Sequence, residues 1–450
     1  MAIFEGPMHS RYVPTAKAGT AVKSGEPGIK PKTQDQLPAD VIAGSLTFAN
    51  EHQLRWWNDS GRLLARLLRA ANYDIAEQYQ YLLFAYSRMI PALGPYPQRW
   101  RSTITTIGVP LEYSINYQEK GREDVRIGFE PVDFVSGTPE DPYNIKTIDK
   151  FVDNLERFAP KGFNREIYDR VVAELFPSAK EVDSLYASGY GKEGRDVKTA
   201  GVFGLDLKGG DISVKGYCFL LLKHLANKVP VDVLMPTSLL RLGEEMGCLT
   251  SLNLMHEYLL ATSGYHQYSF FAWDFAPKKD SRLKFYSFTP QVSLKKVEDL
   301  WTLGGRVNNE VTSKGLELVR RFWELLGIKE QVDDEIIKFE FDPNQENTAA
   351  LKVPLLCNYE VHRESPYPVP KLYFPTYGLN DLEVAHAISR FFRSVGWVDR
   401  AESYPSLLAE LFPDEIIEES SRIQTWISFS YTEKTGPYVS IYYRSAKNSI

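Results

Sequence analysis

A basic residue followed two positions later by a tyrosine recurs along this sequence. The step occurs three times in segments that alternate like β-strands, as Lys215-Gly-Tyr217, Lys284-Phe-Tyr286 and Lys371-Leu-Tyr373. Similar segments carry further cations and tyrosines: Arg126, Arg282, Tyr438 and Tyr442. Side chains two positions apart project from the same face of a strand, so each step places a cation beside an aromatic ring.

Five of these side chains are cations, and if they converge on one cavity they predict a polyanionic ligand. Like charges that are buried together are unfavourable unless an anion accompanies them. A diphosphate is the simplest such anion, and each close pair of opposite charges is worth roughly 4 kcal/mol at an effective dielectric constant of 20. Any one of these cations alone would be read as part of a solvated surface. The repetition favours a binding site.

Tyrosine is abundant, with 26 among 450 residues. Its ring is apolar on both faces and polar at the tip. Aromatic faces attract cations by about 0.5–2 kcal/mol each, so tyrosines around a dry lumen would surround a carbocation and keep water from it. Taken singly, each tyrosine could equally be a packing residue. A diphosphate site beside an aromatic cage is the arrangement expected for the chemistry of an allyl cation.

Glu112 is the candidate acid or base. It belongs to the strand-like segment LEYSINY (111–117), whose partner DVRIGFEP (124–131) contains Arg126. The polar residues of the two segments share a face only if paired positions sum to an even number, because a shift by one residue turns a strand over. We expect Arg126 opposite Asn116, which leaves Glu112 roughly 13 Å away and unpaired, although a shift by two residues would bring the charges together. An unpaired buried carboxyl has a raised pKa or binds a substrate donor.

Motifs of several other enzyme classes are missing from the sequence. It contains no GxGxxG after a strand-like segment, no GxxxxGK[ST] phosphate loop and no GxSxG nucleophile. An aspartate-rich DDxxD, which would hold magnesium on a diphosphate, is also missing, since Asp333-Asp334-Glu335 does not continue it. The seven histidines lack the spacing of metal ligands. We therefore expect no metal site and no required cofactor.

Helical segments and antiparallel hairpins alternate along the chain. Five hairpins are predicted, at 111–131, 202–217, 268–288, 355–375 and 425–444. Helices are predicted at about 54–72, 75–90, 148–187, 220–226, 252–261, 297–301, 316–326, 382–395 and 404–411. An antiparallel sheet must bury its apolar face, and ten strands can close on themselves and lose their edges. The pattern predicts an α+β fold, with helices outside a barrel and a polar lumen inside.

Composition limits the partners and the compartment. Net charge is −6 and the pI is about 5.8, which argues against a nucleic-acid or anionic-membrane surface. Three cysteines without a CxxC pair indicate reduced thiols in the cytoplasm. Five prolines in residues 1–42 favour a disordered tail, before a single domain at 43–450. We see no signal-peptide core and no apolar run long enough to span a membrane.

Long blocks of the sequence resemble the fungal aromatic (indole) prenyltransferases of the dimethylallyltryptophan synthase family. They fall in order within residues 45–445: EQYQYLL (77–83), IPALGPYP (90–97), GVPLEYSIN (108–116), VRIGFEP (125–131), DLWTLGGR (299–306) and SFSYTEKTGPYVSIY (428–442). The resemblance implies the ABBA prenyltransferase fold, a barrel of ten antiparallel strands ringed by α-helices and built from repeated ααββ units. It also implies transfer of a dimethylallyl group from dimethylallyl diphosphate, without a required metal.

The resemblance also implies roles for individual residues. Glu112 matches the glutamate that accepts a hydrogen bond from the indole N–H. Five cations match positions that contact the diphosphate: Arg126, Lys215, Arg282, Lys284 and Lys371. Five tyrosines match the shield around the allyl cation: Tyr217, Tyr286, Tyr373, Tyr438 and Tyr442.

Two positions depart from the members that act on free tryptophan. Val202 stands where those members have a lysine often proposed as proton acceptor, so Glu112 or water would take the proton. Ser269 stands where they have an arginine that holds the amino-acid carboxylate. The segments GPYPQRWRST and RIGFEPVDF resemble members that act on tryptophan-containing cyclic dipeptides, which have no carboxylate.

We therefore expect two small-molecule substrates, dimethylallyl diphosphate and a cyclic dipeptide. Free tryptophan, tyrosine and a polyketide phenol are the alternative acceptors. A barrel that carries a metabolite without catalysis is the alternative from another class of protein. A homodimer is a further expectation.

Overall fold

The computed structural model describes residues 36–158, 160–192, 196–332 and 353–445. Residues 1–35 of the predicted tail lie outside these ranges, as do Asp333, Asp334 and Glu335. The described chain from Leu37 onward belongs to one compact unit. Its first helix, α1 (Pro38–Ser45), begins within the last residues that the sequence had assigned to the tail.

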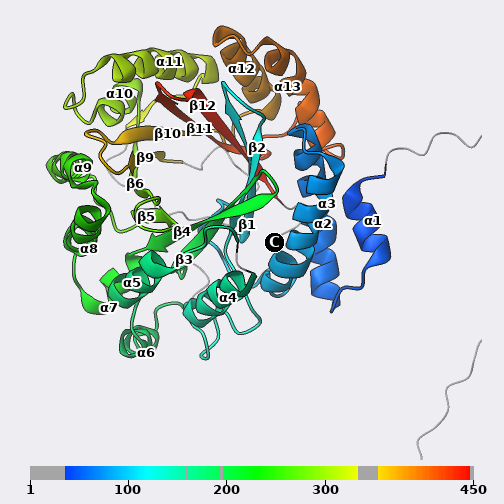
Figure 1. Cartoon of the computed structure of the whole chain (residues 1–450), viewed down its shortest axis with the longest axis horizontal. Coiled ribbons are helices and arrows are strands. Elements are labelled where there is room, and N and C mark those ends of the chain that lie inside the picture. The colour runs from blue at the N-terminus through cyan, green and yellow to red at the C-terminus, as the bar shows by residue number, and fades with distance from the viewer. Residues whose placement is uncertain (1–35, 159, 193–195, 333–352, 446–450) are drawn as a thin grey trace, which may run out of the picture. The chain divides into compact units, whose positions relative to one another are not determined.

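Ten antiparallel strands close into a barrel in the order β1-β12-β11-β10-β9-β6-β5-β4-β3-β2 (Figure 1). Each predicted hairpin supplies two neighbouring strands, and β1 pairs with β12 to close the ring. The closed antiparallel barrel expected from the sequence is thereby confirmed. The strands are β1 (Leu111–Gln118), β2 (Asp124–Phe129), β3 (Gly201–Lys208), β4 (Asp211–Phe219), β5 (Phe270–Asp274), β6 (Leu283–Thr289), β9 (Leu355–Val361), β10 (Val369–Pro375), β11 (Gln424–Thr432) and β12 (Gly436–Arg444).

The register of the first hairpin differs from the expected one by two residues. Arg126 lies opposite Ser114 and not Asn116, while Glu112 lies opposite Gly128. The even sum of paired positions is confirmed, because alternation decides which face each side chain takes. The offset was wrong, because it depends on the length of the turn, which alternation does not reveal. Glu112 is therefore a diagonal neighbour of Arg126, at a typical Cα separation of roughly 7–8 Å.

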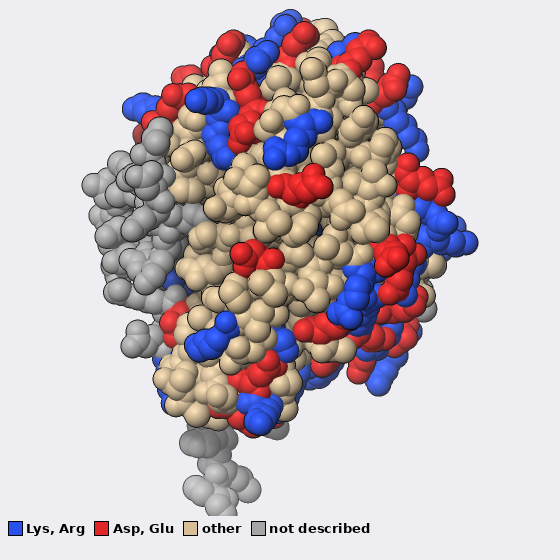
Figure 2. All heavy atoms as spheres, turned by 90° about the vertical axis from the view of Figure 1, so that its left-hand side faces the viewer, with Lys and Arg blue, Asp and Glu red and all other residues tan. Residues whose placement is uncertain are grey.

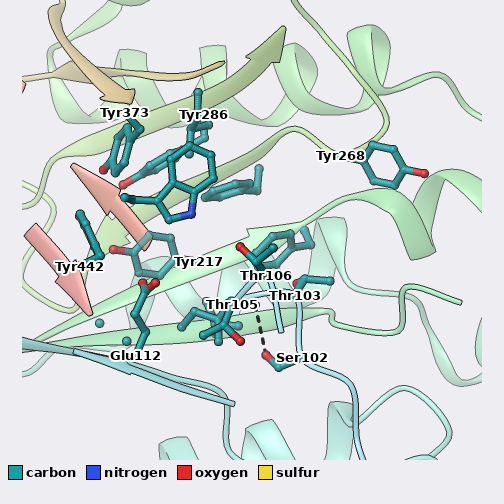
Figure 3. A pocket seen from close by; sticks show the side chains of 18 of the residues that line it. Ser102, Thr103, Thr105, Thr106, Glu112, Tyr217, Tyr268, Tyr286, Tyr373 and Tyr442 are labelled. Carbon is teal, nitrogen blue, oxygen red and sulfur yellow. Dashed lines mark hydrogen bonds between the residues drawn. The ribbon is translucent and has the colours of Figure 1, made fainter. Parts of the chain in front are cut away.

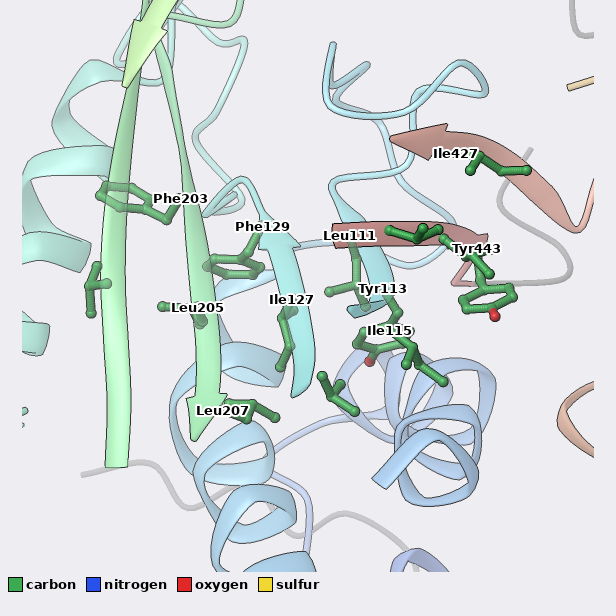
Figure 4. Packing of buried hydrophobic residues seen from close by; sticks show 14 of the residues in the cluster. Leu111, Tyr113, Ile115, Ile127, Phe129, Phe203, Leu205, Leu207, Ile427 and Tyr443 are labelled. Atoms are coloured by element: carbon green, nitrogen blue, oxygen red, sulfur yellow. The ribbon is translucent and has the colours of Figure 1, made fainter. Parts of the chain in front are cut away.

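The outward face of the barrel is apolar and is covered by helices. Figure 4 shows this face for the first strands, where Leu111, Tyr113, Ile115, Ile127 and Phe129 pack toward the surrounding helices. All of these side chains are buried. Each buried large apolar side chain contributes about 1.5–3 kcal/mol, so this layer holds the barrel in shape around its lumen.

A ring of helices surrounds the barrel (Figure 1). The helices after α1 are α2 (Glu51–Ala70), α3 (Ile75–Phe84), α4 (Ile145–Phe158), α5 (Glu166–Leu175), α6 (Ala179–Ala187), α7 (Leu221–Asn227), α8 (Val231–Met246), α9 (Leu249–Ala261), α10 (Leu294–Thr302), α11 (Glu310–Leu326), α12 (Asp381–Ser394) and α13 (Val398–Leu411). Several begin at side-chain caps. At α3, Asp74 and Glu77 form a reciprocal capping box.

Some elements differ from the expectation. The helical region expected at 148–187 is divided into three helices, because Pro160 and Pro177 fall between them and proline cannot continue a helix. Helix α8 and the short pair β7 (Gln291–Val292) and β8 (Gln331–Val332) were not expected. None of these elements supplies a strand of the barrel.

The exterior carries both signs of charge. On the face shown in Figure 2, acidic and basic side chains are interspersed around uncharged areas. With the two signs interspersed, this face does not attract a polyanion strongly. Among the described residues, no helix is both long and apolar enough to cross a bilayer.

Candidate active site

A large cavity occupies the inside of the barrel. It holds about 1470 Å³ of space, counted to its open mouth. This volume includes space open to solvent at the mouth, so the extent of the site is defined by its lining residues. Figure 3 shows tyrosines on one side of the cavity and the segment 101–106 with Tyr268 on the other.

Four tyrosines form a curved wall, which we call the tyrosine cage: Tyr217, Tyr286, Tyr373 and Tyr442. Adjacent ring centroids in this order are 5.9, 6.2 and 5.9 Å apart. The rings come from β4, β6, β10 and β12, which run in the same direction through the barrel. The ring of Phe270 stacks on that of Tyr286, with the two centroids 4.3 Å apart, and so packs against the cage. All four rings line the cavity, where an aromatic face can stabilise a cation.

The five predicted cations also come together. Lys215, Lys284 and Lys371 each precede a cage tyrosine by two residues, so they form a layer next to the cage on the side of the hairpin turns. Of the five, Arg126 lines the cavity itself. We call these five side chains and their ion partners the basic layer. Tyr438, which was expected in the shield, instead lies beside this layer. The centroid of its ring is 4.2 Å from the Lys371 ammonium.

Three carboxylates that the sequence analysis missed stand within the basic layer. Asp206 binds both Arg126 and Lys215. Asp274 forms a two-point pair with Arg282 at 2.7 and 2.9 Å. Glu360 binds Lys284 at 2.6 Å and Arg282 at 3.4 Å. Counted formally, five cations and three carboxylates leave an excess of two positive charges, and not five. The signal was present in the alternation of β3, where Asp206 follows Gly204 on the lumen face.

The pKa directions agree with this pairing. Burial alone would raise the pKa of Asp206 and Glu360, but the neighbouring cations hold both well below the ordinary value. The pKa of Lys215 is lowered to about 8 by burial, against the attraction of Asp206. The pKa of Lys371 is also held well below its ordinary value, by burial and by the nearby cations, first of all Lys284. Among the described residues, no carboxylate is paired with Lys371.

Glu112 lies on the cavity wall below Tyr217 in Figure 3. The residue is 8% exposed, and burial raises the pKa of its carboxyl to about 8. Thr425 donates to it over 3.4 Å. Arg444, which faces Glu112 on β12, is paired with Glu415 at 2.5 Å, so its charge is already compensated. Glu112 is thus a carboxyl that would gain from a new hydrogen-bond donor in the cavity.

Glycines opposite Glu112 create the space in front of it. Gly128 faces Glu112 across β1 and β2, and Gly204 follows on β3. A Cβ atom on Gly128 would come within 2.9 Å of the Ile104 side chain, and one on Gly204 within 3.2 Å of the Tyr217 hydroxyl. A side chain at either position would therefore fill the part of the cavity that adjoins Glu112.

The segment 101–106 is a part of the site that the sequence analysis did not identify. Ser102, Thr103, Thr105 and Thr106 line the cavity opposite the tyrosine cage (Figure 3). The hydroxyl of Thr105 donates to the carbonyl of Val109 and so shapes the segment. This side of the cavity offers hydroxyl groups together with the side chain of Arg101, whereas the cage offers rings.

Comparison with known proteins identifies the family. A sequence profile described as tryptophan dimethylallyltransferase matches residues 52–406. Echinulin prenyltransferase 1 of Aspergillus ruber is 42% identical over 413 residues, 91% of this chain and 98% of that protein. Deoxybrevianamide E synthase notF of an Aspergillus species is 38% identical over 412 residues, 91% of each chain. The chain belongs to the tryptophan dimethylallyltransferase family.

Solved structures of the family share the fold. NotF in complex with brevianamide F and DMSPP superposes with a TM-score of 0.82 at 36% identity, covering 92% of this chain and all of that one. AnaPT from Neosartorya fischeri gives a TM-score of 0.80 at 30% identity, with coverage of 91% and 98%. The resemblance noted in the sequence and the ABBA barrel are confirmed, and the protein is a prenyltransferase.

The two departures from the free-tryptophan members can be located in this dimethylallyltransferase. Val202 lines the cavity beside Tyr217 on the neighbouring strand. Ser269 is fully buried, and its hydroxyl accepts a hydrogen bond from the backbone N–H of His266. Neither position presents a charge to the cavity.

Proposed function

We propose that this dimethylallyltransferase alkylates the indole ring of a tryptophan-containing cyclic dipeptide with dimethylallyl diphosphate. The observation that carries the proposal is the tyrosine cage stacked against the basic layer within one closed lumen. A diphosphate at the basic layer would hold its allyl group among the rings. The acceptor would occupy the remaining space between the cage, Glu112 and the segment 101–106.

The reaction begins with heterolysis of the bond between C1 of the allyl group and the diphosphate oxygen. The electron pair stays with the diphosphate, whose added negative charge is stabilised by the basic layer. The allyl cation is stabilised by the ring faces of the cage, which also exclude water. A carbon of the indole then attacks the cation, and the same carbon loses a proton to a base.

Glu112 would act on the acceptor. An indole N–H that donates to Glu112 replaces the missing partner of this buried carboxyl and favours its ionised form. The carboxylate then stabilises the positive charge that spreads over the indole during attack. Since Val202 cannot accept a proton, Glu112 or a water molecule receives the one released from the ring.

The choice of acceptor follows from charge. A free amino acid carries a carboxylate, and neither Val202 nor Ser269 provides a cation for it. A cyclic dipeptide has two neutral amide groups in place of these charges, which suit the hydroxyls of Ser102, Thr103 and Thr106. The names of notF and its complex with brevianamide F point to the same acceptor class for a relative.

We propose that the chemistry needs no metal ion, because the cations of the basic layer can stabilise the leaving diphosphate. Among the described residues, no group of three His, Cys, Asp or Glu side chains is placed to bind a metal. We expect an excess of EDTA to leave most of the activity, measured as product formed per minute. Loss of all activity that magnesium restores would contradict this part of the proposal.

Turnover on an acceptor panel tests the whole proposal. The enzyme is incubated with dimethylallyl diphosphate and either cyclo-Trp-Pro, cyclo-Trp-Ala, free tryptophan, tyrosine or a polyketide phenol. We expect cyclic dipeptides to give a product heavier by one C₅H₈ unit, at a much higher kcat/KM than free tryptophan. Equal use of free tryptophan would refute the acceptor assignment. Tight binding without product across the panel would favour a metabolite carrier.

A further inference from the structure

The basic layer contains three carboxylates that a diphosphate site does not need. Four of its five cations are held by Asp206, Asp274 or Glu360, and Lys371 by the ring of Tyr438. Each carboxylate comes from the first strand of a hairpin, whereas the cations come from the second. A site selected only for tight binding of an anion would not place three negative charges beside it.

A lumen with cations alone would bind the diphosphate product of the reaction too tightly. When the C–O bond breaks, the diphosphate keeps the electron pair and gains one negative charge over the ester. A purely cationic lumen therefore binds released diphosphate more tightly than the donor, and departure of the product becomes slow. Charges that oppose the diphosphate weaken product binding more than donor binding.

On the basis of the proposed donor, we propose that Asp206, Asp274 and Glu360 are built-in counter-charges that limit diphosphate affinity so that the product is released. They position the cations in the empty lumen and remain ionised when the diphosphate arrives. The pKa of each is held below its ordinary value by the cations, despite burial, so all three carry charge at neutral pH.

Glu360 allows the charge to be removed while the geometry is kept. Arg282 stays fixed by its two-point pair with Asp274 in a Glu360→Gln variant. The amide oxygen of the new side chain can still accept a hydrogen bond from Lys284. His362, which contacts Glu360 at 2.8 Å, is 39% exposed and can be solvated instead. Asp274→Asn is the second variant, since Glu360 then retains Arg282 and Lys284.

The decisive measurement is calorimetric binding of inorganic diphosphate at pH 7, without donor or acceptor. We expect Glu360→Gln and Asp274→Asn each to bind diphosphate about tenfold more tightly than the wild type, with screening by water at the 34% exposed Arg282 limiting the effect. We also expect a lower kcat in steady state, a burst of product in the first turnover, and a single-turnover rate at least as high as that of the wild type, because the removed charge opposed the charge that develops on the diphosphate.

Glu245→Gln is the matched control. Glu245 also joins an arginine and a lysine, Arg170 at 2.5 Å and Lys278 at 2.7 Å, but it lies on the outer helix α8. The diphosphate affinity and kcat of the Glu245→Gln variant should equal those of the wild type. Unchanged or weaker diphosphate binding in both lumen variants would overturn the inference and leave the carboxylates a purely positioning role. A wild-type enzyme that binds no diphosphate would instead refute the proposed donor site itself.

Discussion

The tyrosine cage and the basic layer occupy adjacent levels of one lumen but are assembled differently. The centroids of adjacent cage rings are 5.9–6.2 Å apart, and the four rings come from alternate strands of the barrel. Each ion pair of the basic layer instead joins two neighbouring strands, as Arg126 of β2 joins Asp206 of β3. The cage stabilises charge through ring faces, and the layer through paired charges. Donor binding and protection of the cation should therefore be separable by mutation.

Lys284→Ala should have the largest effect and should act on the donor. It removes a cation of the basic layer and deprives Glu360 of its ion partner at 2.6 Å. Loss of one charged partner in a buried pair costs about 2–5 kcal/mol, so we expect kcat/KM for dimethylallyl diphosphate to fall roughly 30–5000-fold. Steady-state kinetics with the donor varied would measure it, and Lys215→Ala should behave similarly.

Lys278→Ala is the control for this prediction. Lys278 also forms ion pairs, with Glu166 and Glu245, but on the outside of the barrel. The Lys278→Ala variant should therefore keep the wild-type kcat and KM. If Lys284→Ala is folded and its kcat/KM for the donor equals that of the control, Lys284 does not bind the diphosphate.

Glu112→Gln should have the next largest effect and should act on the acceptor step. Glutamine keeps the shape and an acceptor oxygen but cannot carry the negative charge that stabilises the indole during attack. Since charged hydrogen bonds are about twice as strong as neutral ones, we expect a loss of about 2–3 kcal/mol, or roughly 30–150-fold in kcat. The KM for the donor should change little. Wild-type turnover in this variant would remove the role assigned to Glu112.

Tyr286→Leu should have a smaller effect, confined to the cage. Loss of one ring face removes about 0.5–2 kcal/mol of cation stabilisation, or roughly 3–30-fold in the rate of product formation. Water should also capture part of the allyl cation, which chromatography would detect as prenyl alcohol. Tyr286→Phe keeps the ring and should suppress the alcohol. Equal amounts of alcohol from both variants would argue against shielding by the ring face.

The difference between features set within one strand and features set between strands explains which parts of the site the sequence could predict. Cage tyrosines and lumen cations were found because alternation within one strand fixes the face of each side chain. Asp206, Asp274 and Glu360 were missed because their importance depends on pairs between strands, and therefore on register. Register failed in the first hairpin for the same reason, since the turn after Gln118 sets the offset of Arg126. The closed barrel could be predicted because five hairpins have few other ways to bury their apolar faces.

The smallest predicted effect concerns stability, and it tests whether Glu112 is unpaired in the empty enzyme. Burial raises the pKa of Glu112 from 4.5 to about 8. The folded state therefore binds a proton that the unfolded chain has already lost, and the stability tied to this group falls as the pH rises from about 4.5 to about 8. Glutamine has no such proton to lose.

We therefore expect Glu112→Gln to melt at nearly the wild-type temperature at pH 4.5, and a few degrees above the wild type at pH 8.5. Glu130, another buried carboxyl whose pKa burial raises to about 7, titrates in both proteins and cancels in the difference. Thermal unfolding of both proteins across this pH range would measure the effect. A variant less stable than the wild type at pH 8.5 would mean that the Glu112 carboxylate is already stabilised in the empty lumen. Glu112 would then need no hydrogen bond from the indole N–H, and its charge would be compensated like those of the basic layer.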